Sequence, residues 1–173
     1  MIKNSTITIS PSGTLTFAAK FYRCALGKSG IAIDKTEGDG ATPAGTFAIR
    51  KILYRPDRLI KPQTSLKVEH LKSNDAWNDD PTHNDYNKKV SLPHDGHTER
   101  LWREDNLYNI IVVIGFNDKN IKPSKGSAIF LHVAKPNYKN TRGCVALNQV
   151  DLLEVITNPL PPSHIEILPP SGF

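Results

Sequence analysis

The segment Thr141-Arg142-Gly143-Cys144-Val145 places a thiol beside groups that can make it reactive. A cysteine is a nucleophile only as its thiolate, so a cation, an imidazolium or backbone N–H groups must lower its pKa. Arg142 is a permanent cation, and Gly143 permits a tight turn with room for a substrate carbonyl. The N–H groups of Gly143 and Cys144 are then candidates for holding an oxyanion. The pattern predicts a nucleophile on a sharp turn.

A nucleophilic cysteine also needs a base, and His132 lies twelve residues before Cys144, near the end of an apolar run. A strand, a loop and a return can bring two such side chains within hydrogen-bond reach. The spacing alone is a weak signal, because free cysteine is often simply buried and a histidine on a strand is often structural. From the residues alone, a catalytic pair and two structural side chains both stay open.

The elements that must position these residues are mostly strands. Runs rich in β-branched and aromatic residues predict strands at residues 6–9, 14–26, 46–54, 109–116, 127–134 and 164–168. The run 14–26 fits either one bent strand or two paired strands, and 109–116 is typical of a fully buried strand. One short helix is expected over 148–156, with Asn148 as N-cap and with Val150, Leu153 and Ile156 on one face. We therefore expect a mainly β fold.

Residues 56–106 are polar, are rich in Pro, Asn, Asp and His, and contain both tryptophans, Trp77 and Trp102. We expect this stretch to be largely structureless. Long irregular segments in compact domains are often functional, so it is a candidate lid or substrate wall. The alternative is an ordinary surface excursion held down by its aromatic side chains.

Composition limits the class of protein. A chain of 173 residues predicts a single domain, residues 1–173. An apolar fraction of 38% and a mean hydropathy of −0.38 exclude a wholly disordered chain and predict no membrane span. The formal charge of +5 suits an anionic partner such as nucleic acid or an acidic wall polymer and selects neither. We expect no nucleic acid, because no recognition helix or basic stripe with aromatics is present.

The remaining candidate groups predict no further chemistry. Cys24 lies in an apolar run and is most simply a core residue, although a Cys24–Cys144 disulfide stays open. His83, His94 and His97 lie close together in the sequence, but their spacing matches no ligand set, so we expect no metal and no cofactor.

The first six residues, MIKNST, contain neither an apolar stretch nor a small-residue cleavage site. This predicts no signal peptide here. A role inside the cell, another export route and a renumbered chain all stay open.

Three separated motifs resemble the L,D-transpeptidase (YkuD-type) family. The family's active-site signature is a His, a spacer and then Ser/Thr-His-Gly-Cys, and IFLH at 129–132 followed by TRGCV at 141–145 is similar to it. The stretch GATPAGTFAI at 40–49 resembles the family's Thr-Pro-x-Gly-x-Phe motif. ERLWR at 99–103, through Tyr108, and VVIGFN at 112–117 resemble one bacterial branch. The likeness runs from about residue 20 to the C-terminus.

The resemblance implies an L,D-transpeptidase-like β-sandwich with one or two short helices and a cysteine at the edge of a cleft. Cys144 would be the nucleophile and His132 the general base, with the oxyanion held at Gly143 and Cys144. Arg142 stands where the family has a histidine, so it would steady the thiolate or bind a substrate carboxylate. Glu99, Trp102 and Asn117 are candidates for lining the cleft or for structural roles.

The implied reaction is acyl transfer on peptidoglycan stem peptides or muropeptides, through a thioester, with release of a terminal D-amino acid. Hydrolysis of the same thioester would make an L,D-carboxypeptidase, and a non-catalytic wall-binding module on the same fold is a further alternative. The resemblance also implies the periplasm or cell envelope, no metal or cofactor, and a monomer.

Overall fold

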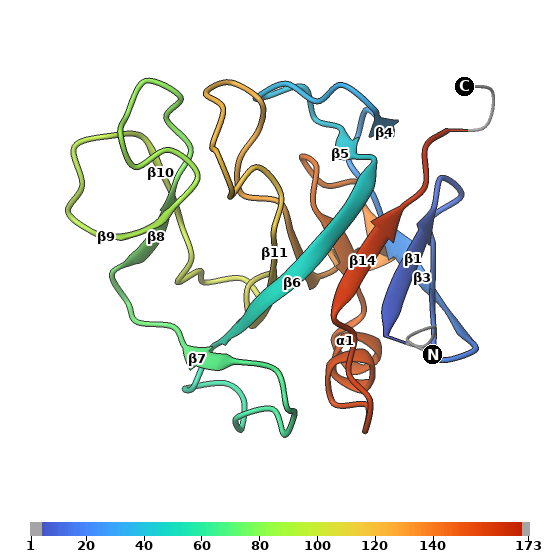
Figure 1. Cartoon of the computed structure of the whole chain (residues 1–173). Helices are drawn as coiled ribbons and strands as arrows, with labels where there is room; N and C mark the ends of the chain where they lie inside the picture. Colours follow the sequence, from blue (N-terminus) through green and yellow to red (C-terminus); the bar gives the residue numbers. More distant parts are fainter. Residues whose placement is uncertain (1–4, 171–173) are drawn as a thin grey trace.

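The computed structural model describes residues 5–170 (Figure 1). The prediction of no signal peptide rests on the first six residues, and the first four of these lie outside this range. The main sheet contains nine strands: β1 (Thr6–Ser10), β2 (Thr14–Phe17), β3 (Lys20–Ala25), β6 (Gly45–Tyr54), β7 (Val68–His70), β11 (Ile110–Ile114), β12 (Phe130–Val133), β13 (Val145–Leu147) and β14 (His164–Ile167). The prediction of a mainly β fold is confirmed. The run 14–26 forms two antiparallel strands, β2 and β3.

The main sheet closes on itself. Its strand order is β11-β12-β13-β3-β2-β1-β14-β6-β7, and β11 also pairs with β6. The ten-residue strand β6 makes this closure, because its first half pairs with β14 and its second half with β11. The expected sandwich is therefore wrong in this respect, and the architecture is a closed, barrel-like sheet.

The larger of two hydrophobic clusters lies inside the closed sheet, and a second cluster joins β11 residues Ile111 and Val113 to Trp77 of the small three-stranded sheet. Alternate residues of β1 and β2 are buried, and all five residues of β11 are buried, as a continuous apolar run predicts. The largest fully buried side chains include Ile7, Ile9, Leu15, Phe17 and Ile52. Burial of this apolar surface is the main term that stabilises the sheet.

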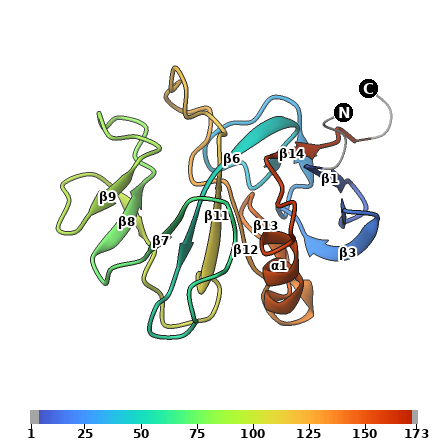
Figure 2. The same cartoon turned by 60° about the horizontal axis from the view of Figure 1, so that its bottom comes forward.

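Helix α1 (Gln149–Ile156) lies beside β12 and β13 (Figure 2). The Asn148 side chain accepts a hydrogen bond from the Val150 N–H at 2.8 Å, so the predicted N-cap is confirmed. The predicted face is wrong at Val150, which is exposed, whereas Leu152, Val155 and Ile156 are buried against the core. A short 3-10 turn, Pro136–Tyr138, is the other helical element in the described chain.

The expectation of a structureless stretch at 56–106 is wrong. Besides β7, the segment contains a three-stranded sheet of β8 (Asp75–Asn78), β9 (Lys89–Ser91) and β10 (Thr98–Arg100), in the order β10-β8-β9. This small sheet stands to one side of the closed sheet in Figure 1. Trp77 joins the two, because its ring packs edge-on against Phe130 at 4.9 Å between centroids. The two short strands β4 (Ile31–Ala32) and β5 (Thr42–Pro43) form a separate parallel pair.

None of the helices in the described chain has the length and apolar character to cross a membrane.

Candidate active site

His132 on β12 and Cys144 directly before β13 line one cavity. Strands β12 and β13 are parallel, and His132 pairs with Ala146. Paired residues point to the same side of a sheet and alternate along a strand, so Cys144, two residues before Ala146, shares the side of His132. Both side chains line a cavity of about 690 Å³. The structure thus brings together the two residues that the sequence nominates for nucleophile and base.

The Cys144 thiol is buried and is held by two backbone groups. Its S–H donates to the Ala128 carbonyl at 3.2 Å, and the Phe130 N–H donates to the sulfur at 3.4 Å. Burial raises the pKa of the thiol to about 12, and the negative charge of Glu99 adds to this, whereas the Phe130 N–H and the Lys35 ammonium oppose it. The thiol of the resting site is therefore neutral at physiological pH.

The His132 imidazole is also neutral. Its Nδ1 lies 2.8 Å from the Val133 carbonyl oxygen, which can only accept, so Nδ1 carries the proton and Nε2 keeps its lone pair. Burial lowers the pKa of the ring to about 4. The edge-on ring of Tyr108, 5.3 Å away between centroids, packs against it. The free nitrogen is thus Nε2, which is the atom available as a base.

Gly143 forms the turn that presents Cys144. Its φ is +141°, and a Cβ at this position would lie 2.8 Å from the Ala41 carbonyl oxygen, so only glycine fits. The Gly143 N–H donates to the Thr141 hydroxyl at 3.0 Å, and that hydroxyl donates to the Cys144 carbonyl at 2.6 Å. Of the two N–H groups expected to hold an oxyanion, the one on Gly143 is therefore already engaged in the resting site. The Cys144 N–H has no backbone partner within residues 5–170.

Arg142 lies exposed among the residues that line the cavity. Burial raises the pKa of the Glu99 carboxyl, and the charge of Arg142 opposes this rise weakly. The cation that acts on the thiol is Lys35. Lys35 is buried and bonds Asp39 at 2.6 Å. Sequence reasoning missed Lys35, since no local signal marks a buried lysine.

Of the three other residues proposed to line the cleft, one lines the cavity and two do not. Glu99 lines the cavity and accepts a hydrogen bond from the Tyr108 hydroxyl at 2.6 Å, and burial raises the pKa of Glu99. Trp102 and Asn117 are not among the residues that line it. Trp102 stacks under the Arg55 guanidinium at 3.8 Å, and the Asn117 amide donates to the carbonyls of the 117–126 loop. Those two are structural, as the alternative interpretation allowed.

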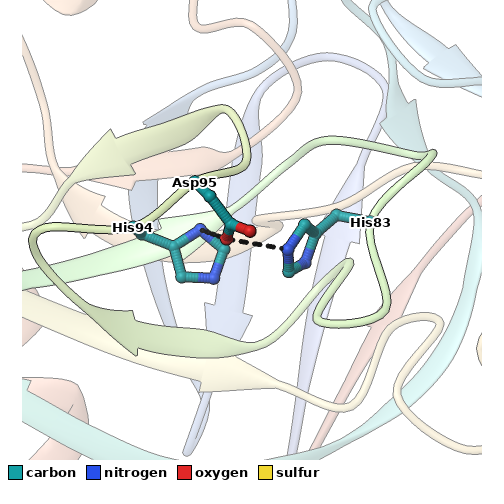
Figure 3. Close-up of side chains that lie close together, drawn as sticks. All are labelled: His83, His94 and Asp95. Atoms are coloured by element: carbon teal, nitrogen blue, oxygen red, sulfur yellow. Dashed lines mark hydrogen bonds and ion pairs between the residues drawn. The ribbon is translucent and has the colours of Figure 1, made fainter.

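Cys24 and Cys144 are both free thiols, so the structure contains no disulfide between them. Cys24 lies buried in β3 opposite Leu147, as expected for a core residue. Outside the cavity, ligand atoms of His83, His94 and Asp95 lie within 4.8 Å of one another (Figure 3), although the sequence spacing predicted no such grouping.

Comparison with known proteins supplies the family. Among solved structures, the chain is similar to L,D-transpeptidase 1 of Mycobacterium tuberculosis, with 14% identity and a TM-score of 0.43 over 96% of this chain. The chain spans 60% of that protein's length. No curated protein sequence matches it. Residues 4–167 match the family model described as the L,D-transpeptidase catalytic domain. Because this match covers nearly the whole sequence, the chain belongs to the L,D-transpeptidase catalytic domain (YkuD) family.

Proposed function

We propose that this protein is a cysteine L,D-transpeptidase that acts on peptidoglycan stem peptides through a thioester. The observation that carries the proposal is the position of Cys144 and His132, which line the same cavity, His132 from β12 and Cys144 from the turn directly before the adjacent parallel strand β13. Membership of the family supplies the reaction class, and the cavity supplies a nucleophile with a neutral base.

The first half of the proposed reaction forms the thioester. His132 Nε2 takes the proton from the Cys144 thiol as the sulfur attacks the carbonyl carbon of the diamino acid that precedes the terminal D-amino acid. Donors at the turn, the Cys144 N–H first, stabilise the oxyanion. The C–N bond then breaks, and the imidazolium returns its proton to the departing amine. The stem stays attached as a thioester.

The second half releases the product. The amine of a second stem attacks the thioester and forms a cross-link, while the sulfur leaves and regains its proton through His132. If water attacks instead, the product is a shortened stem and the enzyme is an L,D-carboxypeptidase.

The charges around the cavity suit an anionic substrate. Four cations that line it make no ion pair within the described residues: Lys28, Lys135, Lys139 and Arg142. Stem peptides end in carboxylates, which such cations attract and which Arg142 can bind with two parallel hydrogen bonds. We therefore assign substrate binding, rather than acid–base chemistry, to Arg142, whose guanidinium stays protonated.

The test is incubation with purified disaccharide-tetrapeptide, followed by mass spectrometry of the products and of the intact protein. We expect cross-linked dimers and a thioester-linked adduct on Cys144. Cys144→Ala should lose both, whereas the matched variant Cys24→Ala should retain both because Cys24 lies outside the cavity lining. Shortened stems without dimers would identify the carboxypeptidase. Absence of products and adduct from a folded protein would favour the wall-binding module.

A further inference from the structure

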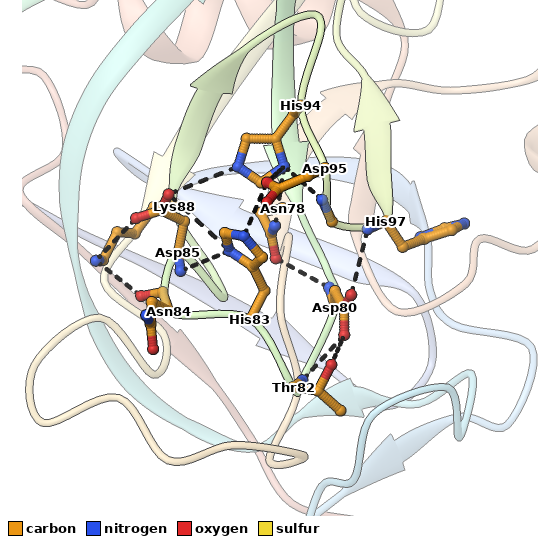
Figure 4. A network of polar contacts seen from close by, with 11 residues as sticks. Asn78, Asp80, Thr82, His83, Asn84, Asp85, Lys88, His94, Asp95 and His97 are labelled. Atoms are coloured by element: carbon orange, nitrogen blue, oxygen red, sulfur yellow. Dashed lines mark hydrogen bonds and ion pairs between the residues drawn. The ribbon is translucent and has the colours of Figure 1, made fainter.

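Two loops of the small sheet bring imidazole and carboxylate groups together. The β8–β9 loop carries His83 and Asp85, and the β9–β10 loop carries His94 and Asp95. We call these four residues the histidine cluster. Figure 4 shows the hydrogen bonds that tie the two loops together around it. The proposed acyl transfer makes no use of these residues, because none of them lines the catalytic cavity.

The ligand atoms of the histidine cluster are close together. Asp95 Oδ1 lies 3.0 Å from His83 Nε2 and 3.8 Å from His94 Nδ1 (Figure 3). Zn–N and Zn–O bonds of about 2.0 Å at tetrahedral angles place neighbouring ligand atoms roughly 3.3 Å apart. The two distances bracket that value, and ligand atoms of all three residues lie within 4.8 Å of one another, so the three side chains are near enough to close around one ion.

We propose that the histidine cluster binds a divalent transition-metal ion of the zinc class. The ligands are His83 Nε2, His94 Nδ1 and Asp95 Oδ1, and the fourth position is left for water. Two imidazoles and one carboxylate favour zinc-class ions over Mg²⁺ and Ca²⁺, which prefer oxygen ligands.

Asp85 is placed to orient one of the ligands. Its carboxylate Oδ2 lies 3.5 Å from His94 Nε2, the ring nitrogen that would not bind the metal. Ligating histidines usually direct this second nitrogen at a carboxylate or a carbonyl, which sets the ring and its tautomer. Asp85 therefore acts as a positioning residue and not as a ligand.

Gly96 permits the close approach of the two loops. A Cβ at Gly96 would lie 2.7 Å from the Asn78 amide nitrogen and 3.0 Å from the His83 ring. The two imidazoles are 4.6 Å apart between centroids. A larger residue at position 96 would push the His83 ring away, so glycine here serves the cluster.

The local charge also favours a cation. Residues 79–97 carry four aspartates, Asp79, Asp80, Asp85 and Asp95, against two lysines, Lys88 and Lys89, in a chain whose net charge is +5. The net negative charge of residues 79–97 therefore attracts a cation, although the protein as a whole is basic.

Metal binding competes with two backbone hydrogen bonds. The Asp85 N–H donates to His83 Nδ1 and the Gly96 N–H donates to His94 Nδ1, each at 3.0 Å. When His83 binds through Nε2, its proton moves to Nδ1, where Asp85 Oδ2 at 4.0 Å is the nearby acceptor. The site is thus one that forms on binding, at the expense of these two bonds.

The test is isothermal titration calorimetry of the purified protein with ZnCl₂, together with metal analysis of the protein after gel filtration. All variants carry Cys144→Ala, so that the cavity thiol does not compete for zinc. We expect one zinc per chain and a rise in melting temperature. His83→Ala and His94→Ala should each weaken binding at least about tenfold, and Asp85→Asn by about tenfold. The matched control His70→Ala, on an exposed position of β7, should bind as the parent does.

Asp95→Asn guards against loss of folding, because the Asp95 side chain is 88% exposed. It should weaken zinc binding while far-UV circular dichroism stays unchanged. Unchanged zinc uptake in both histidine variants would overturn the proposal, as would absence of zinc uptake by the parent. Equal affinity for Mg²⁺ would overturn the assigned metal class.

Discussion

The Cys144 thiol donates its proton to a backbone carbonyl in the resting site, not to its proposed acceptor. The S–H donates to the Ala128 carbonyl, and Ala128 adopts a φ of +52°, a conformation uncommon for a residue with a side chain. The first event of the proposed reaction is therefore rotation of the S–H bond from Ala128 toward His132 Nε2. Since both groups are neutral before substrate binds, proton transfer accompanies attack on the carbonyl and does not precede it.

Burial raises the pKa of the Cys144 thiol most, and the negative charge of Glu99 adds to this rise. Glu99→Gln should therefore lower that pKa and keep the hydrogen bond from the Tyr108 hydroxyl. Alkylation of Cys144 by iodoacetamide at pH 8 should become severalfold faster in a Cys24→Ala background. The measurement is the rate of adduct formation by mass spectrometry as a function of pH.

Glu104→Gln is the matched control for this effect. Glu104 is exposed and does not contribute to the pKa of Cys144, so the alkylation rate should match the parent. An unchanged or slower alkylation rate in Glu99→Gln would show that the charge of Glu99 does not raise the pKa of the Cys144 thiol.

At the scale of elements, the turn before β13 decides where the sulfur lies. Gly143→Ala adds a Cβ only 2.8 Å from the Ala41 carbonyl oxygen at a φ of +141°. We expect a loss of about 1–3 kcal/mol in the free energy of unfolding and loss of the acyl adduct. Urea unfolding and intact-protein mass spectrometry measure the two effects.

Gly30→Ala separates backbone strain from the clash. Gly30 also has a positive φ, +75°, but nothing lies within 4 Å of its Cβ position. It should cost about 1 kcal/mol and keep the adduct. Loss of the adduct in both variants would mean that the close approach to Ala41 is not what positions Cys144.

Helix α1 offers a test of which face is buried. Leu152 is fully buried and Val150 is 71% exposed. Leu152→Ala should therefore lower the free energy of unfolding by about 2–5 kcal/mol, and Val150→Ala by less than about 0.5 kcal/mol. Chemical denaturation measures both, and a similar loss in the two variants would contradict the observed orientation of the helix.

The error in the helix face has a physical origin. The eight residues QVDLLEVI carry apolar side chains at 150, 152, 153, 155 and 156, so two different faces satisfy a period of 3.6. Strands 46–54 and 109–116 were predictable because their local patterns are long. Their mutual pairing was not, because the closure between β6 and β11 depends on residues about 60 positions apart. The three-residue strands of 56–106 are too short to show a period.

Part of the candidate site was also predictable from the sequence, and part was not. Cys144 and His132 are only twelve residues apart, so their spacing and the resemblance of the flanking motifs to the family nominated them from the sequence. Lys35 and Tyr108 reach the site from other parts of the chain, and their contacts with it follow from the tertiary fold. The hydrogen bond of the Gly143 N–H was not predictable either, because its acceptor is the Thr141 side chain.

At the scale of the whole molecule, three buried titratable groups are held neutral. Burial raises the pKa of Cys24 and of Cys144 to about 12 and lowers that of His132 to about 4. A group that the folded state keeps neutral destabilises the fold wherever the unfolded chain would charge it. These residues therefore add no pH dependence between about pH 6.5 and 9, and they destabilise the protein on both sides of that range.

The acid side of this range isolates His132. Below about pH 6.5 the His132 imidazole of the unfolded chain is protonated, whereas that of the folded protein stays neutral down to about pH 4. The free energy of unfolding should therefore fall as the pH is lowered through this interval. At 1.36 kcal/mol per unit, the loss is roughly 3 kcal/mol. His132→Gln should remove this part of the slope in urea unfolding at stepped pH, whereas His164→Gln, at an exposed position, should keep it. An identical slope in His132→Gln and the parent would mean that folding does not lower the pKa of His132.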